Sequence, residues 1–319
     1  MQRHILVQNI ISEDDCMKAF VTGGNGFLGR HLICELIKRD IDVVSYDLSK
    51  PLDSDIEKYA DCKSHIEYIQ GDILDKEQLL LAMRGCEIVF HTAAVADINV
   101  VSKIPEKTME INVLGTTRCL EAAKVSGVKR FIFASSVYAA GNHGSFYSIS
   151  KRACESLCKT YFEEFGLEFT ILRYGSLYGT EANQWNFIYG MCKELLTTGK
   201  YTYTSSPDSL RDYINILDAS RESVNIALEQ DFINKTVMIA GHQRMKISEL
   251  FTMIEEILGK KIEVSYAPKS VQSHYHMTAY SFDPDVPIRI NMSHYIDISE
   301  GILECINHIN DELHKDKNV

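Results

Sequence analysis

The sequence predicts an α/β fold, in which a doubly wound parallel sheet carries a smaller C-terminal lobe. From residue 17 onward, short runs rich in Val, Ile and Phe alternate with segments of helical length and period. The runs are almost continuously apolar, which is typical of parallel strands buried on both faces. After about residue 174 this alternation stops. Because crossovers between parallel strands are right-handed, the pattern indicates a Rossmann-type sheet with helices on both sides.

The first part of the chain supplies the strands and helices of this sheet. The clearest helix has a single apolar stripe, at steps of three and four residues, from Phe146 to Tyr161. The predicted strands are 17–22, 42–46, 66–69, 88–91, 131–134 and 169–172, and the helices between them include 27–39, 105–126 and 145–165.

The rest of the chain is predicted to form a lobe over the carboxyl ends of the strands, where ligands of such sheets bind. Its first part is polar and rich in turns, and a strand-like run at 236–240 precedes helical patterns at 248–258 and 298–313. We expect a sheet domain at 17–174 to which 211–240 returns, a second lobe made of 175–210 and 241–319, and an N-terminal extension at 1–16 that adds an edge strand.

Composition and charge exclude several classes of protein. The chain has 319 residues and a formal net charge of −11, with no basic cluster longer than a pair, so neither a nucleic acid nor an anionic membrane is an expected partner. The absence of a long apolar run and of a signal-peptide pattern predicts a soluble, cytoplasmic protein. Nine scattered cysteines without a Cys-x-x-Cys predict reduced core thiols. No metal site is expected, because His274, His276 and Asp283 lie in a predicted loop.

A glycine-rich turn follows the first predicted strand directly. Gly23, Gly26 and Gly29 have the spacing G-x-x-G-x-x-G, and Phe27 and Leu28 open the next helix. Missing Cβ atoms let the backbone approach a pyrophosphate, and a helix N-terminus offers free N–H groups and partial positive charge. Tight turns also use glycine, but a preceding strand and a following helix are the context that a dinucleotide site requires. We therefore expect these five residues to bind a dinucleotide.

Carboxylates end the second and third predicted strands. Asp47 follows the glycine turn by about twenty residues, the place from which a carboxylate accepts hydrogen bonds from the adenosine ribose and repels a 2′-phosphate. Asp47 therefore favours NAD over NADP, with a turn residue ahead of Pro51 as the alternative. Asp72, which precedes Ile73, is expected near the adenine, and a simple cap is the alternative for it.

A phenol and an ammonium group are four residues apart near the start of helix 145–165, at Tyr147 and Lys151. They therefore share one face of the helix, although such pairs also arise by chance. Tyrosine titrates about three units too high to act as a base near neutral pH, which corresponds to about 4 kcal/mol. A cation about 4 Å away supplies roughly that much at an effective dielectric near 20, so Lys151, helped by an oxidised nicotinamide, is expected to acidify Tyr147. Ser135 and Ser136 end the fifth strand and offer a hydroxyl to the reacting oxygen, or simply satisfy the loop backbone.

Together these motifs resemble the extended short-chain dehydrogenase/reductase family over about residues 17–310. Within that family the likeness is closest to nucleotide-sugar epimerases of the UDP-glucose 4-epimerase type. The motifs that carry it are the glycine turn, Asp47, His91-Thr92-Ala93-Ala94, Asn112-Val113-x-Gly115-Thr116, Ser135-Ser136, Tyr147-x-x-x-Lys151, residues 172–179 and Arg211-Asp212-Tyr213-Ile214-Asn215.

The resemblance implies a role for individual residues. Tyr147 would be the acid/base, Lys151 would hold the nicotinamide ribose, and Ser136 would bind the sugar hydroxyl. The resemblance places Ala93 and Ile73 in the cofactor site with Asn112, which would support the active-site helix. For the nucleotide diphosphate it implies Ser176 and Arg211 as binding residues.

The sequence also departs from the family pattern. Only ten residues separate Ser136 from Tyr147, where relatives usually have a longer loop over the sugar. Val137 and Tyr138 stand where 4,6-dehydratases have Asp-Glu, and the Glu of sugar-acid decarboxylases is missing. The resemblance therefore implies epimerisation at C4 of a UDP- or GDP-linked sugar, through a transient 4-keto sugar.

Other readings stay open. An NAD(P)-dependent 4-keto-sugar reductase or a C4 dehydrogenase would use the same residues, and a non-catalytic dinucleotide-binding protein is a distant alternative. Trp185 and Phe187 lie in the region that contacts substrate in the family, or they pack the second lobe. By analogy with relatives, helices 105–126 and 145–165 predict a homodimer.

Overall fold

The computed structural model describes residues 17–59, 62, 65–141, 145–242, 244–267 and 286–315. The predicted edge strand at 1–16 and the residues His274, His276 and Asp283 lie outside this range. Within the described residues, no helix combines the length and the apolar character needed to cross a membrane.

A parallel sheet forms the centre of the larger lobe, as predicted, and every strand expected before residue 174 is present. Its strands are β1 (Lys18–Thr22), β2 (Asp42–Asp47), β3 (Ile66–Gln70), β4 (Ile88–His91), β5 (Arg130–Ser136), β6 (Glu168–Tyr174), β10 (Lys235–Ile239) and β13 (Ile288–Arg289). Their order is β13-β10-β6-β5-β4-β1-β2-β3, and all neighbours are parallel.

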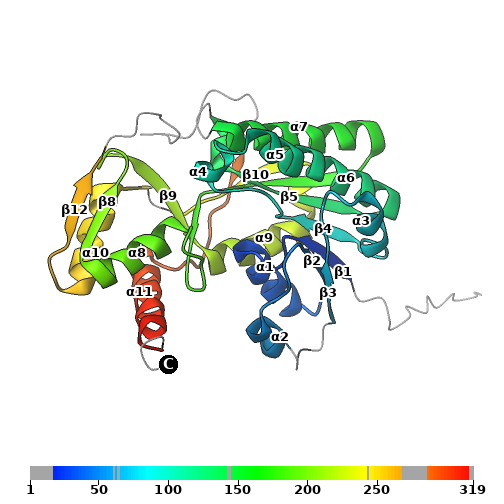
Figure 1. Cartoon of the computed structure of the whole chain (residues 1–319). Coiled ribbons are helices and arrows are strands. Elements are labelled where there is room, and N and C mark those ends of the chain that lie inside the picture. Colours follow the sequence, from blue (N-terminus) through cyan, green and yellow to red (C-terminus); the bar gives the residue numbers. More distant parts are fainter. Residues whose placement is uncertain are drawn as a thin grey trace, which may run out of the picture.

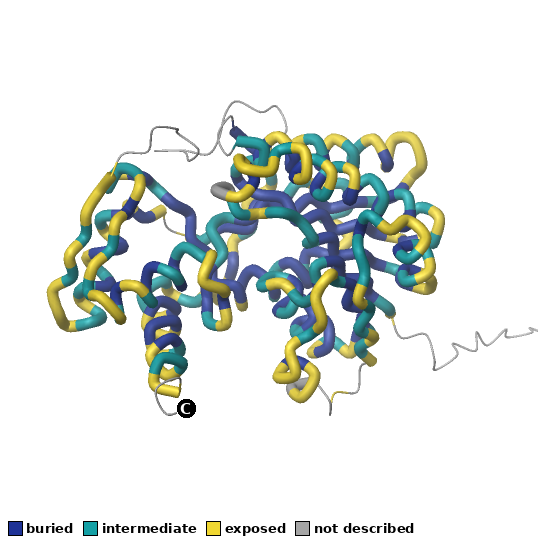
Figure 2. The backbone as a smooth tube through the Cα atoms, in the orientation of Figure 1, coloured by how far each residue is buried: buried dark blue, intermediate teal, exposed yellow. Residues whose placement is uncertain are grey.

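Helices cover both faces of this sheet (Figure 1). On one face lie α1 (Phe27–Ile37) and α9 (Ile216–Leu228), and on the other lie α3 (Lys76–Ala82), α6 (Gly115–Ser126) and α7 (Ser145–Phe165). Side chains alternate between two cores, because successive residues of a strand point to opposite faces. In β1, Ala19 and Val21 pack with Leu32 of α1, whereas Phe20 packs with Leu120 of α6. The inner strands are accordingly buried along most of their length, whereas the edge strands β3 and β13 are half-buried or exposed (Figure 2).

The segment predicted as one helix over 105–126 is divided in the structure. It consists of α5 (Pro105–Met109), a π-helical turn η1 (Glu110–Leu114) and α6. Asn112 lies in the π-turn, where its side chain bonds the backbone of Val95 and the hydroxyl of Ser150. Single π-turns inside helices often mark functional sites, and this one directs a buried amide toward α7.

The smaller lobe lies to the left of the main sheet in Figure 1. Its helices are α8 (Phe187–Thr198), α10 (Ile247–Leu258) and α11 (Ile298–Lys315), which share one apolar core. Strands β7 (Ser176–Tyr178), β9 (Leu210–Asn215) and β11 (Arg244–Lys246) form one small sheet, and β8 (Lys200–Tyr203) pairs with β12 (Glu263–Tyr266). The remaining short elements are α2 (Asp53–Tyr59), α4 (Ile98–Val101), η2 (Val137–Ala140) and η3 (Gln230–Phe232).

The chain crosses between the two lobes more than once. After β6 it enters the small lobe, and β9 runs there between β7 and β11. It then returns through α9 and β10 to the main sheet, where β10 pairs with β6. The carboxyl ends of the main strands therefore face the smaller lobe, and the candidate site lies at this boundary.

Candidate functional site

A cleft of about 720 Å³ opens at the carboxyl ends of the main strands. It brings together every predicted cofactor-binding residue except Asn112, which is buried behind it. Among the residues that line it are Gly23, Gly26, Phe27, Leu28, Gly29, Asp47, Asp72, Ile73, Ala93, Ser136, Tyr147, Lys151 and Ser176.

The glycine turn at one end of the cleft leaves no room for side chains. Gly23 has φ +67°, and a Cβ there would lie 2.9 Å from the Ala93 nitrogen. A Cβ on Gly29 would lie 2.1 Å from the Gly23 carbonyl oxygen. The N-cap residue of α1, Gly26, makes no side-chain cap. The first N–H groups of the helix are therefore left without a side-chain partner where Gly26, Phe27 and Leu28 line the cleft. The turn therefore fits the pyrophosphate of a dinucleotide.

The carboxylate of Asp47 is held in a fixed orientation at the edge of the cleft. It accepts hydrogen bonds from the Asn25 N–H at 3.1 Å and from the backbone and hydroxyl of Ser49 at 2.8 Å. Asp47 thus organises its own turn and still lines the cleft, so the two readings of this residue are compatible. Likewise, Asp72 accepts from the Leu74 N–H at 2.8 Å, as a cap does, and also lines the cleft.

Ser136 and Tyr147 meet at the floor of the cleft. The Ser136 hydroxyl is hydrogen-bonded to the Tyr147 phenol, and its oxygen also accepts from the Tyr138 N–H at 3.3 Å. The neighbouring Ser135 instead donates to Glu155 at 2.5 Å. Of the two serines, the geometry therefore leaves Ser136 to face the tyrosine.

The chain alone does not lower the pKa of Tyr147, and its acidification by Lys151 together with an oxidised nicotinamide stays a prediction. Burial raises the pKa of Tyr147 to about 12, which outweighs the lowering effect of the Ser136 hydrogen bond. The Lys151 Nζ donates to the Ala134 carbonyl at 2.7 Å and lies 5.7 Å from the centroid of the Tyr147 ring. Burial also lowers the pKa of Lys151 to about 8, because an ammonium group is costly to desolvate. We therefore expect the acidification of Tyr147 to depend on the positive charge of a dinucleotide bound in the cleft.

A buried ion pair behind this site had not been predicted. Glu155 lies one helical turn after Lys151 and accepts from Arg173 of β6 at 2.9 and 2.7 Å. The two side chains are only 6% and 5% exposed. With the bond from Ser135, the pair ties α7 to β5 and β6. The four-residue spacing places Glu155 on the same face of α7 as Lys151, but nothing in the local sequence identified Arg173 as the partner of Glu155.

His91 joins three elements beneath the cleft in one hydrogen-bond network. Its Nδ1 lies 2.7 Å from the Thr22 hydroxyl and its Nε2 lies 2.9 Å from the Thr116 hydroxyl. Thr116 donates its proton to the Asn112 carbonyl, so it accepts from His91, and Nε2 carries the ring proton. Burial lowers the pKa of His91 to about 3, and the ring therefore stays neutral.

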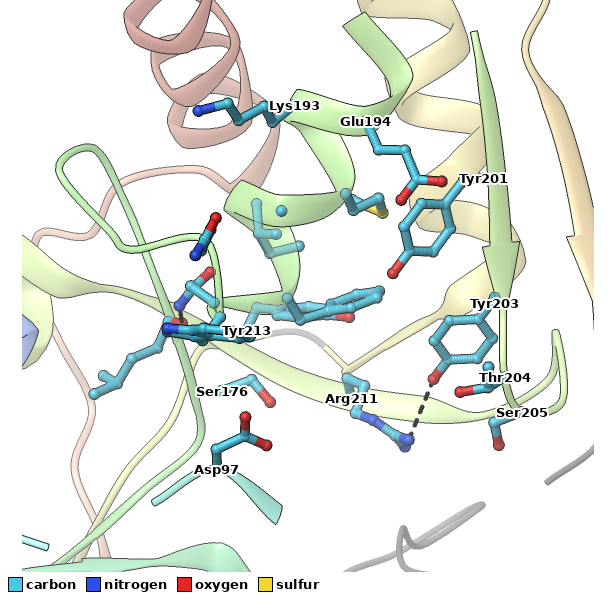
Figure 3. Close-up of a pocket in the computed structure, with 18 of the residues that line it drawn as sticks. Asp97, Ser176, Lys193, Glu194, Tyr201, Tyr203, Thr204, Ser205, Arg211 and Tyr213 are labelled. Atoms are coloured by element: carbon cyan, nitrogen blue, oxygen red, sulfur yellow. Dashed lines mark hydrogen bonds between the residues drawn. The ribbon is translucent and has the colours of Figure 1, made fainter. Parts of the chain in front are cut away.

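A second cavity of about 770 Å³ adjoins the cleft and extends into the smaller lobe (Figure 3). It contains Ser176 and Arg211, the two predicted diphosphate ligands. Arg211 is buried and donates to the Tyr203 hydroxyl at 3.3 Å, the bond drawn in Figure 3. Tyr201 and Tyr203 of β8 line the same wall and had not been predicted, because a four-residue strand in a polar region has little periodicity. The cavity thus offers a cation and aromatic surface.

Metal ligands do not gather anywhere in the described parts of the chain. No group of three His, Cys, Asp or Glu side chains there could hold a metal ion.

Comparison with known proteins gives concordant matches. The model of the NAD dependent epimerase/dehydratase family matches residues 19–240. The chain is 26% identical over 306 residues to a putative UDP-glucose 4-epimerase of Methanocaldococcus jannaschii, covering 90% of this chain and 96% of that protein.

Solved structures share the fold. UDP-glucose 4-epimerase of Thermotoga maritima, with UDP-glucose, superposes with a TM-score of 0.79 at 23% identity, covering 93% of this chain and 100% of that one. UDP-glucuronic acid 4-epimerase of Bacillus cereus, with UDP-glucuronic acid and NAD, has a TM-score of 0.81 at 24% identity and the same coverage. At these identities the likeness shows the fold alone.

Proposed function

Because the chain belongs to the NAD dependent epimerase/dehydratase family, we propose that it is an NAD-dependent epimerase that inverts C4 of a nucleotide-linked sugar. The observation that carries this proposal is the contact of Ser136 with Tyr147 at the floor of a cleft. One end of the cleft fits a dinucleotide, and the other opens into the cavity that contains Arg211.

Tyr147 takes the proton of the C4 hydroxyl, and Ser136 holds the hydroxyl oxygen beside it. When bound, NAD would supply the hydride acceptor for C4 and a positive charge that favours the tyrosinate. Tyr147 keeps the proton while C4 is a ketone and gives it back when the C–H bond forms on the opposite face. Lys151, whose Nζ donates to the Ala134 carbonyl and lies near the Tyr147 ring, would hold the nicotinamide ribose. The sugar regains both its proton and its hydride, so the reaction causes no net oxidation or reduction.

The smaller lobe, which α8, α10 and α11 form with the sheet β11-β9-β7, holds the nucleotide diphosphate. In this reading Arg211 and Ser176 bind the phosphates, and the aromatic wall at Tyr201 and Tyr203 faces the nucleotide. The ten-residue spacing between Ser136 and Tyr147 leaves room for the keto sugar to turn over. The relatives that carry UDP-sugars in their names support a UDP-linked substrate, with a GDP-linked sugar as the alternative.

The test is incubation of the purified chain with UDP- and GDP-linked hexoses, followed by separation of the products. We expect the C4 epimer to form without a net accumulation of NADH, and Tyr147→Phe to abolish it. Tyr295→Phe, at a half-exposed tyrosine away from both cavities, serves as the matched control. Steady formation of NADH would instead identify a C4 dehydrogenase, and full activity in Tyr147→Phe would remove this residue from the mechanism.

We also propose that the protein is a homodimer. Apolar side chains on its outer helical layer support this, since Leu114, Ile149 and Phe162 are 41%, 47% and 38% exposed. Light scattering coupled to gel filtration measures the mass directly, and Ile149→Asp should shift a dimer toward the monomer. A monomeric mass for the unaltered chain would contradict the proposal.

A further inference from the structure

The cleft at the strand ends, which contains Tyr147, and the second cavity, which contains Arg211, share one wall. In the proposed function, the diphosphate lies near Arg211 and the reacting carbon near Tyr147. The sugar between them must then lie against this wall, so the subsite inferred below depends on that function. The described residues that line both cavities are Ala96, Ser176, Leu177, Trp185, Asn186 and Phe187.

The two aromatic residues of the shared wall differ in how they are packed. Phe187 is partly buried, with its ring centroid 5.6 Å from that of Tyr203 and 6.3 Å from that of Tyr201. Trp185 is 70% exposed. Packing of the smaller lobe therefore explains Phe187, but it does not explain a large apolar ring left in solvent at the meeting point of two cavities.

The backbone at Trp185 is nevertheless fixed on both sides. Its N–H donates to the Asn183 side chain at 3.1 Å. The next residue, Asn186, caps α8 through the Tyr189 N–H at 3.3 Å and donates to the Leu177 carbonyl at 2.8 Å. The ring is thus exposed on an anchored backbone, which lowers the entropy lost when it contacts a ligand.

We propose that Trp185 is the residue against which the hexose ring of the substrate stacks, and that this subsite takes an uncharged sugar. One face of a pyranose carries C–H groups, which pack on the face of an indole while the hydroxyls point to polar groups. None of the described residues that line both cavities carries a charge, so that wall offers no counter-ion to a sugar carboxylate. Asp97, directly after Ala96, adds a negative charge beside it.

Intrinsic fluorescence isolates this contact, because Trp185 is the single tryptophan of the chain. The full-length protein is titrated with UDP-glucose, GDP-mannose, UDP and GDP, and calorimetry measures binding in parallel. We expect the nucleotide sugar that binds to change the emission, and the corresponding free nucleoside diphosphate to change it much less. A nucleotide sugar that binds with no change in emission would overturn the proposal.

Variants give the second readout. We expect Trp185→Ala to weaken binding of the nucleotide sugar about tenfold or more, to leave the affinity for the free diphosphate unchanged, and to be largely rescued by Trp185→Phe. Phe165→Ala, at an aromatic side chain that is 54% exposed at the end of α7, is the matched control and should bind like the unaltered chain. Unchanged affinity in Trp185→Ala would overturn the proposal.

Uronates test the uncharged subsite. The uronate of the same nucleotide should bind about tenfold more weakly than the hexose, and tighter binding would overturn this part of the proposal. All these measurements are of binding, so stacking without epimerisation would remove only the proposed activity. Epimerisation by Trp185→Ala at an unchanged KM would remove only the stacking role. If no UDP- or GDP-hexose binds, both proposals fall.

Discussion

Substitution of Glu155 should reveal how strongly the buried ion pair holds α7 against the sheet. The Glu155–Arg173 contact at 2.7 Å has a gross Coulomb energy of about 6 kcal/mol at an effective dielectric near 20. Desolvation of both charges offsets most of this, so the pair as a whole contributes little net stability. Removing one partner is different, because the guanidinium of Arg173 then stays buried without its counter-charge. We expect Glu155→Ala to lower the free energy of unfolding by about 4 kcal/mol and Glu155→Gln by about 3 kcal/mol.

Urea denaturation measures these free energies, and a double-mutant cycle separates the pair from its surroundings. Arg173→Met alone should also cost several kcal/mol, since it leaves Glu155 buried and charged. The double variant Glu155→Leu/Arg173→Met should recover to within about 2 kcal/mol of the unaltered chain, because apolar residues of similar volume replace buried pairs well.

An exposed pair provides the control for this cycle. Lys107 and Glu110 are 53% and 46% exposed, so Glu110→Gln should change the unfolding free energy by no more than about 0.5 kcal/mol. A loss of less than about 1 kcal/mol in the unfolding free energy of Glu155→Gln would contradict the expected role of the pair. Losses of the two single variants that simply add in the double variant would contradict it as well.

Three further predictions concern the cleft. The pKa of Lys151 is lowered to about 8 from its ordinary 10.5, so the unfolded chain binds more protons between these values. The free energy of unfolding should therefore rise by about 3 kcal/mol between pH 8 and pH 10.5 relative to that of Lys151→Met, which urea denaturation at a series of pH values would measure. The same pH dependence in both proteins would contradict this prediction. Asp47→Ala should weaken NAD binding about tenfold and narrow the preference over NADP, which titration calorimetry with both cofactors checks. Asn112→Ala removes hydrogen bonds to Val95 and Ser150 and should lower the free energy of unfolding by about 2 kcal/mol, as urea denaturation would measure. An unchanged free energy of unfolding would show that this amide does not stabilise the packing of the π-turn against α7.

Residues close together in the sequence were the ones that could be predicted. The glycine turn and the Tyr147–Lys151 pair are each contained in one local element, and strand ends at Asp47 and Ser136 follow from apolar runs. Since the carboxyl ends of parallel strands share one edge, local assignments were enough to place these residues in one cleft.

Features that depend on partners far along the chain could not be predicted. The pairing of Glu155 with Arg173 needs the register of β5 against β6, and the wall at Tyr201 and Tyr203 needs the fold of the smaller lobe. The rise in the pKa of Tyr147 depends on burial, which the spacing of residues along a helix does not reveal.

The π-turn at Glu110–Leu114 joins α5 directly to α6. A π-turn closes i→i+5 hydrogen bonds where an α-helix closes i→i+4, so it holds one extra residue. Deletion of one residue here would convert the turn into α-helix without a large rotation of α6 relative to α5. The residues of the turn itself would shift, so the Asn112 amide would leave Val95 and Ser150. We therefore expect a one-residue deletion in this turn to break the contact of Asn112 with α7, although α5 and α6 would still form one helical stretch.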